Sequence, residues 1–142
     1  MRRNRLAAAV VAGAMLLAGA SAGAESKREY ENRFRLMLDL AVRMNEYVRQ
    51  HLGDRSLGDY AQRIAEKNAR AAEKMTPPEQ FELLHPHFLL VLENIERGFH
   101  YASEGRLDRY RHHQKVVRKE LHVLEMMAER EGLGLYLWDR GF

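Results

Sequence analysis

Residues 81–102 read FELLHPHFLLVLENIERGFHYA, and this stretch decides the fold. Its apolar side chains recur every three or four positions, which is the period of an α-helix that buries one side. A helix with one apolar side must pack against another element of the same kind. The positions concerned are Phe81, Leu84, Phe88, Leu92, Ile95, Phe99 and Ala102.

The same period recurs near 26–52, 57–75 and 106–131, and the quoted stretch belongs to a helix expected over 77–104. Because the connections are short, the sequence predicts an all-α fold, an up-down-up-down antiparallel four-helix bundle over 25–131. The expected core positions of the other helices are Tyr30, Phe34, Met37, Leu38, Ala41, Met44, Val48 and Leu52; then Leu57, Tyr60, Ile64, Ala71 and Met75; then Leu107, Tyr110, Val117, Leu121, Leu124 and Ala128. Asn45 and Asn68 fall on core stripes, where we expect polar contacts that set the register.

Local signals mark the ends of these helices. A hydroxyl three residues before an acid is typical of a helix start, and a glycine just past the last turn is typical of a helix end. The starts are expected at Ser26 with Glu29, Ser56 with Asp59, and Thr76 with Glu79, where Pro77 would be the first helical residue; the ends are expected at Gly53, Gly105 and Gly132.

Pro86 interrupts the helix expected over 77–104. Its ring would collide with the carbonyl of Glu82, and it disfavours helical geometry at His85. We therefore predict a lead-in over 77–84 and a main helix from Pro86. Without the break, the side chains of His85 and His87 would point about 200° apart. With the break they could converge, so the pair is either a helix-entry motif or a set of metal ligands.

The first 24 residues are typical of a secretory signal peptide. Three arginines precede an uncharged apolar run over 6–18, and small residues offer cleavage sites after Ala22 or Ala24. The run is shorter than a membrane span, so no transmembrane anchor is expected. The predicted location is the periplasm or the exterior.

Composition narrows the chemistry. The whole chain has 23 basic and 20 acidic residues, and Arg2, Arg3 and Arg5 lie in the signal segment, so the mature chain has 20 of each. This neutrality gives no support to a nucleic-acid partner. The absence of cysteine excludes disulfides, thiolate metal sites and covalently attached haem. Four serine and threonine side chains remain after residue 24, and three are expected as helix caps, so we predict a non-enzymatic protein.

The mature chain is rich in histidine, the commonest transition-metal ligand. We consider His85, His87 and His122 as candidate metal ligands. Counting residues from the connections places His87 level with His122 in the last hairpin, and Met37 beside His122 between the first and fourth helices. The alternatives are solvated imidazoles and acid–histidine pairs on the outer surface.

The stretches TPP at 76–78 and NIERGFHYASEGRL at 94–107 resemble soluble periplasmic b-type cytochromes, which are four-helix bundles. The resemblance implies a non-covalent haem held by a methionine of the first helix and a histidine of the fourth. Met37 and His122 are the corresponding candidates here. In the best alignment of the fourth helix, Glu125 falls where the family has its histidine.

Surplus apolar and basic residues indicate partners. Several apolar residues fall outside the core stripes and predict a second face, covered either by the C-terminal tail or by another subunit; they are Leu36, Leu40, Tyr47, Leu89, Leu90, Val116 and Val123. The tail 132–142 is apolar, and its alternation predicts an extended segment that packs back over the bundle or presents Tyr136 and Trp138 to a partner.

Three functional hypotheses follow. The first is an exported protein-interaction or self-associating bundle, a homodimer or a partner of an envelope protein, with Leu89, Leu90, Tyr136 and Trp138 as candidate contacts. The alternative is a metal- or haem-binding bundle that uses the histidines of its third and fourth helices. The third is a protein that binds an anionic envelope surface through its basic end, from Arg97 to Lys119.

Overall fold

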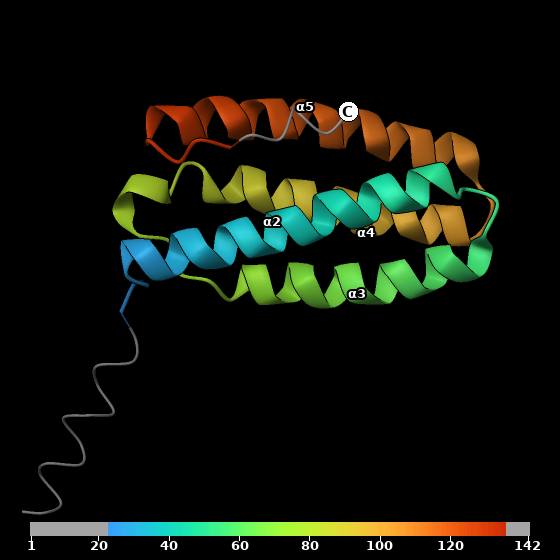
Figure 1. The fold of residues 1–142 in the computed structure, drawn as a ribbon, viewed down its shortest axis with the longest axis horizontal. Helices are drawn as coiled ribbons and strands as arrows, with labels where there is room; N and C mark the ends of the chain where they lie inside the picture. Colours follow the sequence, from blue (N-terminus) through green and yellow to red (C-terminus); the bar gives the residue numbers. More distant parts are fainter. Residues whose placement is uncertain (1–22, 136–142) are drawn as a thin grey trace, which may run out of the picture.

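The computed structural model describes residues 23–135, in which four long helices lie side by side as a bundle and are joined by short connections (Figure 1). The helices are α2 (Lys27–Gln50), α3 (Arg55–Glu73), α4 (His85–Ser103) and α5 (Leu107–Arg130), with a short 3₁₀ turn, η2 (Glu79–Phe81), before α4. The described residues contain no strand. The all-α four-helix prediction is confirmed. Residues 1–22, which hold most of the predicted signal peptide, lie outside the described residues.

One predicted helix start is confirmed and one is wrong. Ser26 caps α2, since its hydroxyl accepts from the backbone N–H of Glu29 and the Glu29 carboxylate accepts from the backbone N–H of Ser26. For α3 the cap is Asp54, whose carboxylate accepts from the backbone N–H of Leu57 at 2.9 Å. Ser56 is already the second residue of that helix.

The expected helix start at Thr76 is also wrong. Residues 75–78 are non-helical, and the Thr76 carbonyl accepts a hydrogen bond from the backbone N–H of Glu25. This bond ties the segment after α3 to the residues before α2. The main helix of this region begins at His85, with Pro86 in its first turn, where a missing N–H does no harm. The predicted break before Pro86 is present, but it lies one residue earlier than expected, since His85 is itself helical. The lead-in over 77–84 contains only the 3₁₀ turn η2.

Two of the three predicted glycine ends are confirmed. Gly105 and Gly132 have φ of +73° and +72°, and the residue after each donates its N–H to a carbonyl five positions earlier. Gly53 does not have a positive φ. There α2 ends instead with His51 in an irregular conformation, and Asp54 starts α3 immediately afterwards.

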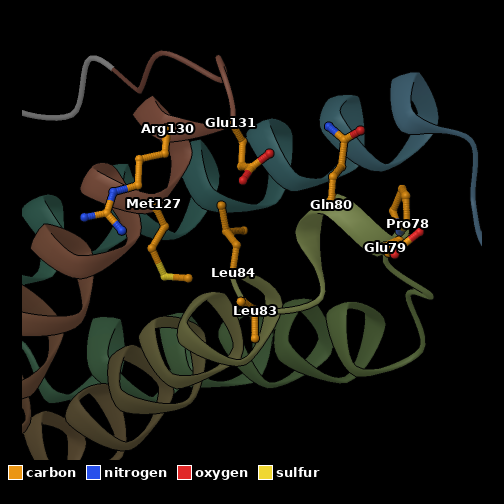
Figure 2. A pocket seen from close by; sticks show the side chains of 8 residues that line it. All are labelled: Pro78, Glu79, Gln80, Leu83, Leu84, Met127, Arg130 and Glu131. Atoms are coloured by element: carbon orange, nitrogen blue, oxygen red, sulfur yellow. The ribbon is translucent and has the colours of Figure 1, made fainter.

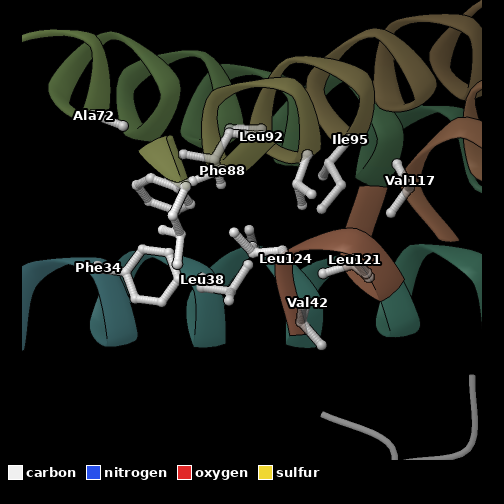
Figure 3. Packing of buried hydrophobic residues seen from close by; sticks show 14 of the residues in the cluster. Phe34, Leu38, Val42, Ala72, Phe88, Leu92, Ile95, Val117, Leu121 and Leu124 are labelled. Carbon is white, nitrogen blue, oxygen red and sulfur yellow. The ribbon is translucent and has the colours of Figure 1, made fainter. Parts of the chain in front are cut away.

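Most of the large core residues come from α2, α4 and α5, and Phe81 of η2, Leu84 and Leu133 complete the set. Figure 3 shows Phe34, Leu38 and Val42 of α2 meeting side chains of α4 and α5, and all of them are almost inaccessible to water. The α4 and α5 members labelled there are Phe88, Leu92, Ile95, Val117, Leu121 and Leu124.

α3 joins the bundle through small residues. Its buried positions are Gly58, Ala61, Ala65 and Ala72. A Cβ at Gly58 would lie 2.8 Å from the backbone nitrogen of Ser103, so α3 and α4 approach backbone to backbone there. The predicted core position of Tyr60 is therefore wrong, since its side chain is 65% exposed.

Two asparagines fix how α2 sits between its neighbours. The Asn45 and Gln114 side-chain amides exchange two hydrogen bonds of 2.8 Å between α2 and α5. The Asn68 amide of α3 donates to the Met37 carbonyl of α2 at 3.0 Å. Both predicted polar contacts are thus present, because a buried amide requires partners of its own kind.

Candidate protein-contact surface

Large apolar side chains remain in contact with water along α2 and α3. Leu36, Leu40 and Tyr47 of α2 are 73%, 43% and 55% exposed, and Tyr60 of α3 is 65% exposed. The three α2 residues are spaced by four and seven, so they lie along one side of that helix. We call this surface, with Met44 and Ile64, the α2–α3 apolar face.

A shallow groove of about 350 Å³ runs through the α2–α3 apolar face. Arg43 is the one charged residue among those that line it, and it forms an ion pair with Asp39 at 2.8 Å. On the α3 side Arg63 pairs with Asp59 at 2.6 Å. The apolar lining consists chiefly of Leu40, Met44, Tyr47, Leu57, Tyr60 and Ile64. The groove is therefore apolar except for Arg43, whose charge is paired.

The sequence reveals half of this surface. Leu36, Leu40 and Tyr47 were expected outside the core because they fall off the α2 stripe. Tyr60 was assigned to the core, since the period of α3 alone fits both a large-residue stripe through Tyr60 and Ile64 and a small-residue stripe through Ala61 and Ala65. The row of small residues Gly58, Ala61 and Ala65 is the sequence signal for the buried side of α3, because small residues let another backbone come close. It would have placed Tyr60 on the exposed side.

Leu89 and Leu90, the other predicted contacts, do not belong to this surface. Leu89 is half-buried against the core and borders a hollow of about 350 Å³ between α3 and α4, whose other lining residues are mostly charged. Leu90 is 39% exposed on α4. Their role in partner binding stays a prediction.

The start of the C-terminal tail packs back over the bundle. Leu133 is buried, Leu135 contacts the core, and the Arg35 guanidinium donates to the carbonyls of Leu133 and Gly134. Tyr136 and Trp138, the predicted partner contacts of the tail, lie outside the described residues. Arg35 and Leu40 are about 140° apart on α2 by helical geometry. Up to residue 135, the tail thus runs along a different side of α2 from the apolar face.

The two histidines around Pro86 bind different helices. His85 is buried, and its Nδ1 lies 2.9 Å from the Tyr30 hydroxyl of α2. His87 is half-buried, and its Nδ1 lies 2.7 Å from the Glu120 carboxylate of α5. Burial lowers the pKa of His85, an effect that the negative charge of Glu25 opposes. Burial, and secondarily the charge of Glu25, raises the pKa of Tyr30. The pair therefore joins helices as neutral groups near pH 7.

The remaining candidate ligands lie apart. His122 is exposed on α5, while Met37 is half-buried and its carbonyl accepts from Asn68 of α3. Neither lines any of the three hollows described here. Between residues 23 and 135, no group of three or more histidine, aspartate or glutamate side chains is placed to hold a metal ion. The metal and haem assignments stay predictions.

A larger hollow of about 680 Å³ lies between η2 and the end of α5. Figure 2 shows Leu83, Leu84 and Met127 beside Arg130 and Glu131, with Gln80, Pro78 and Glu79 on the η2 side. Its volume falls in the range of small-molecule sites. Both signs of charge surround the three apolar side chains, so the lining favours no single class of ligand.

Comparisons with protein-family models, curated proteins and solved structures found no match to this chain. The four-helix architecture stands on the structure, and the resemblance to b-type cytochromes rests on the sequence alone. None of the helices in the described part is both long and apolar enough to cross a membrane.

Proposed function

We propose that this protein is exported, is cleaved near Ala22 or Ala24, and acts in the periplasm or outside the cell as a non-enzymatic bundle that self-associates. The contact is the α2–α3 apolar face, and the partner is a second copy of the chain. The observation that carries the proposal is the exposure of Leu36, Leu40, Tyr47 and Tyr60 on one surface. Apolar patches of this kind mark interaction sites on proteins that are otherwise well packed.

Aromatic residues strengthen this reading. Tyr47 and Tyr60 both border the groove, and tyrosine is enriched where interfaces concentrate their binding energy. Each offers a broad apolar ring with few rotatable bonds, so that little conformational entropy is lost on binding. Withdrawing such rings and two leucines from water supplies the driving force for association.

The rim charges favour a second copy over a charged partner. Each copy presents two arginines and two aspartates that already neutralise each other, Arg43 with Asp39 and Arg63 with Asp59. Paired charges of this kind attract nucleic acid or anionic lipid only weakly. In a two-fold symmetric pair the same surface meets itself, and balanced charges create no net repulsion.

The α2 spacing suits an antiparallel pair. When two α2 helices cross about the midpoint between residues 40 and 43, Leu36 of each copy faces Tyr47 of the other. Leu40 then faces Arg43 of the other copy, whose aliphatic stem can cover it while the guanidinium stays with Asp39. Every exposed apolar position of α2 thus gains a partner.

Light scattering tests the self-association. The chain beginning at Glu25 should show the mass of two copies at about 100 µM and dissociate on dilution. Leu40→Glu with Tyr47→Glu should give a monomer of unchanged helix content. Leu83→Glu is the matched control, because Leu83 is 79% exposed but lies outside the α2–α3 apolar face. A wild-type monomer at the highest concentration would refute the proposal.

Cysteine cross-linking tests the register, since the chain has no cysteine of its own. An oxidised mixture of Leu36→Cys and Tyr47→Cys chains should form disulfide-linked heterodimers. Either variant alone should stay uncross-linked, since equal positions lie about 16 Å apart along antiparallel helices. Efficient homodimer cross-linking of the single variants would instead indicate a parallel pair.

A further inference from the structure

α5 carries a row of exposed basic side chains that is separate from the α2–α3 apolar face. Arg111, Lys115, Arg118 and Lys119 are all exposed. Their spacing of four, seven and eight residues places them on one side of the helix. We call this row the α5 basic face. It spans about 12 Å along the helix axis.

On one side of a single helix, the α5 basic face gathers basic residues that are not in ion pairs within the described part of the chain. On α2, α3 and α4, four exposed arginines pair with an acid one turn away; the pairs are Arg43 with Asp39, Arg63 with Asp59, Arg70 with Glu66, and Arg97 with Glu93. Within residues 23–135, none of the four basic residues of the α5 basic face forms an ion pair. The sequence holds no acid from 109 to 119.

The nearest carboxylates on α5 do not compensate this charge. Glu120 is buried on the side that faces α4, where it binds His87. Asp108 lies in the first turn of α5, three residues before Arg111, but within residues 23–135 it forms no ion pair, and one carboxylate offsets at most one of the four positive charges. The positive charge predicted for the whole segment from Arg97 to Lys119 is thus concentrated on α5, since Arg97 is paired with Glu93 and Arg106 lies near Glu104.

Without a bound partner, the four positive charges of the α5 basic face destabilise the bundle. Arg111 and Lys115, and Lys115 and Lys119, are like charges one turn apart and repel each other. An anionic partner would convert this repulsion into attraction. The shape of the α5 basic face indicates the kind of partner. None of its four residues lines one of the three hollows of the described part of the chain, so the face offers no cavity for a small anion. A convex row suits an extended anionic surface better than a small anion.

We propose that the α5 basic face binds the anionic headgroups of a phospholipid membrane surface. A row of four basic residues on one helix is the pattern that such surfaces attract, each residue near the surface contributing about fivefold to affinity. The mature chain is neutral overall, so the attraction must come from this row and not from the net charge. Because salt screens it over a Debye length of about 10 Å at about 0.1 M, the binding must weaken as salt is added. This proposal does not depend on self-association.

Vesicle sedimentation tests it with the chain beginning at Glu25, which lacks the basic signal segment. The protein should bind vesicles of phosphatidylglycerol and phosphatidylcholine in about 50 mM salt, and at least tenfold more weakly in about 300 mM salt. The variant Arg111→Gln, Lys115→Gln, Lys119→Gln should lose affinity by about 100-fold. The matched control is Arg63→Gln, Arg70→Gln, Arg97→Gln, which changes the net charge equally but removes only paired arginines.

The control variant should keep its binding, and circular dichroism should show the same helix content for both variants. Equal loss in the two variants would reduce the effect to net charge and overturn the proposal. Binding to pure phosphatidylcholine vesicles, or binding insensitive to salt, would also overturn it. Tighter binding to duplex DNA than to the anionic vesicles would assign the face to a different polyanion.

Discussion

The hydroxyl of Tyr30 on α2 lies 2.9 Å from Nδ1 of His85, the first residue of α4. The two residues are 55 positions apart, and both are buried. This bond joins the start of α2 to the start of α4, at the point where Pro86 forces the chain to begin a new helix. His85, one of the predicted metal ligands, thus also links two helices through its Nδ1.

Removing the Tyr30 hydroxyl should destabilise the bundle. In Tyr30→Phe the aromatic packing is kept, but His85 Nδ1 loses its partner in a buried site, which costs about 1–3 kcal/mol. Urea unfolding followed by circular dichroism measures the difference. Tyr60→Phe is the control, because the Tyr60 side chain is 65% exposed and its change should stay within about 0.5 kcal/mol. Equal effects of the two changes would contradict a structural role for the bond.

Stability should fall as the solution becomes acidic. The pKa of His85 in the folded protein is lowered by burial, below the unfolded value of about 6.5. Below pH 6.5 His85 is protonated in the unfolded chain but still neutral in the folded protein. The free energy of unfolding therefore decreases as the pH falls from 6.5 toward the lowered pKa of folded His85. His113 acts in the same direction, since burial and then the charges of His112, Arg97 and Arg109 lower its pKa.

The variant His85→Asn isolates the contribution of His85. Asparagine retains a polar group for Tyr30 but does not titrate, so its loss of stability between about pH 7.5 and 5.5 should be smaller than in the wild type. The part due to His113 should remain. Urea unfolding at both pH values measures the difference, and an unchanged loss would show that the titration of His85 is not coupled to folding.

Gly58→Ala should loosen the contact of α3 with α4. The added Cβ would lie 2.8 Å from the Ser103 nitrogen and 3.1 Å from its Cα, and backbone atoms cannot rotate away. We expect a cost of about 1–3 kcal/mol, despite the better helix propensity of alanine. Gly53→Ala, where no atom lies within 4 Å, should leave the stability unchanged or slightly higher. Thermal unfolding of the two variants separates the packing clash at Gly58 from the general effect of replacing a glycine by alanine.

The amide pair Asn45–Gln114 should behave as one unit. Each single change to leucine leaves the other amide without its partner and should cost about 1–3 kcal/mol. The double change should cost less than the sum, with a coupling of about 0.5–3 kcal/mol. A double-mutant cycle from urea unfolding provides the number. Additive effects would mean that the two reciprocal bonds of 2.8 Å do not stabilise the α2–α5 contact.

The sequence by itself determined the features that depend on a few neighbouring residues. The four helices, the cap of α2 by Ser26, the break before Pro86 and the left-handed ends at Gly105 and Gly132 all follow from local geometry. Counting residues from the connections also predicts which residues of α2 and α5 lie at the same height in the bundle. The hydrogen bond between Asn45 and Gln114 agrees with that count.

Only the tertiary structure decided which side of α3 is buried and which groups the histidines bind. The period of α3 fits two stripes, and the small one was chosen because Gly58 and Ala61 let two backbones come close, which leaves Tyr60 outside. His85 and His87 likewise bind Tyr30 and Glu120, which belong to different helices. The helical period of the sequence shows which sides of a helix are apolar. Which of these sides is buried depends on how closely the neighbouring helix can approach it.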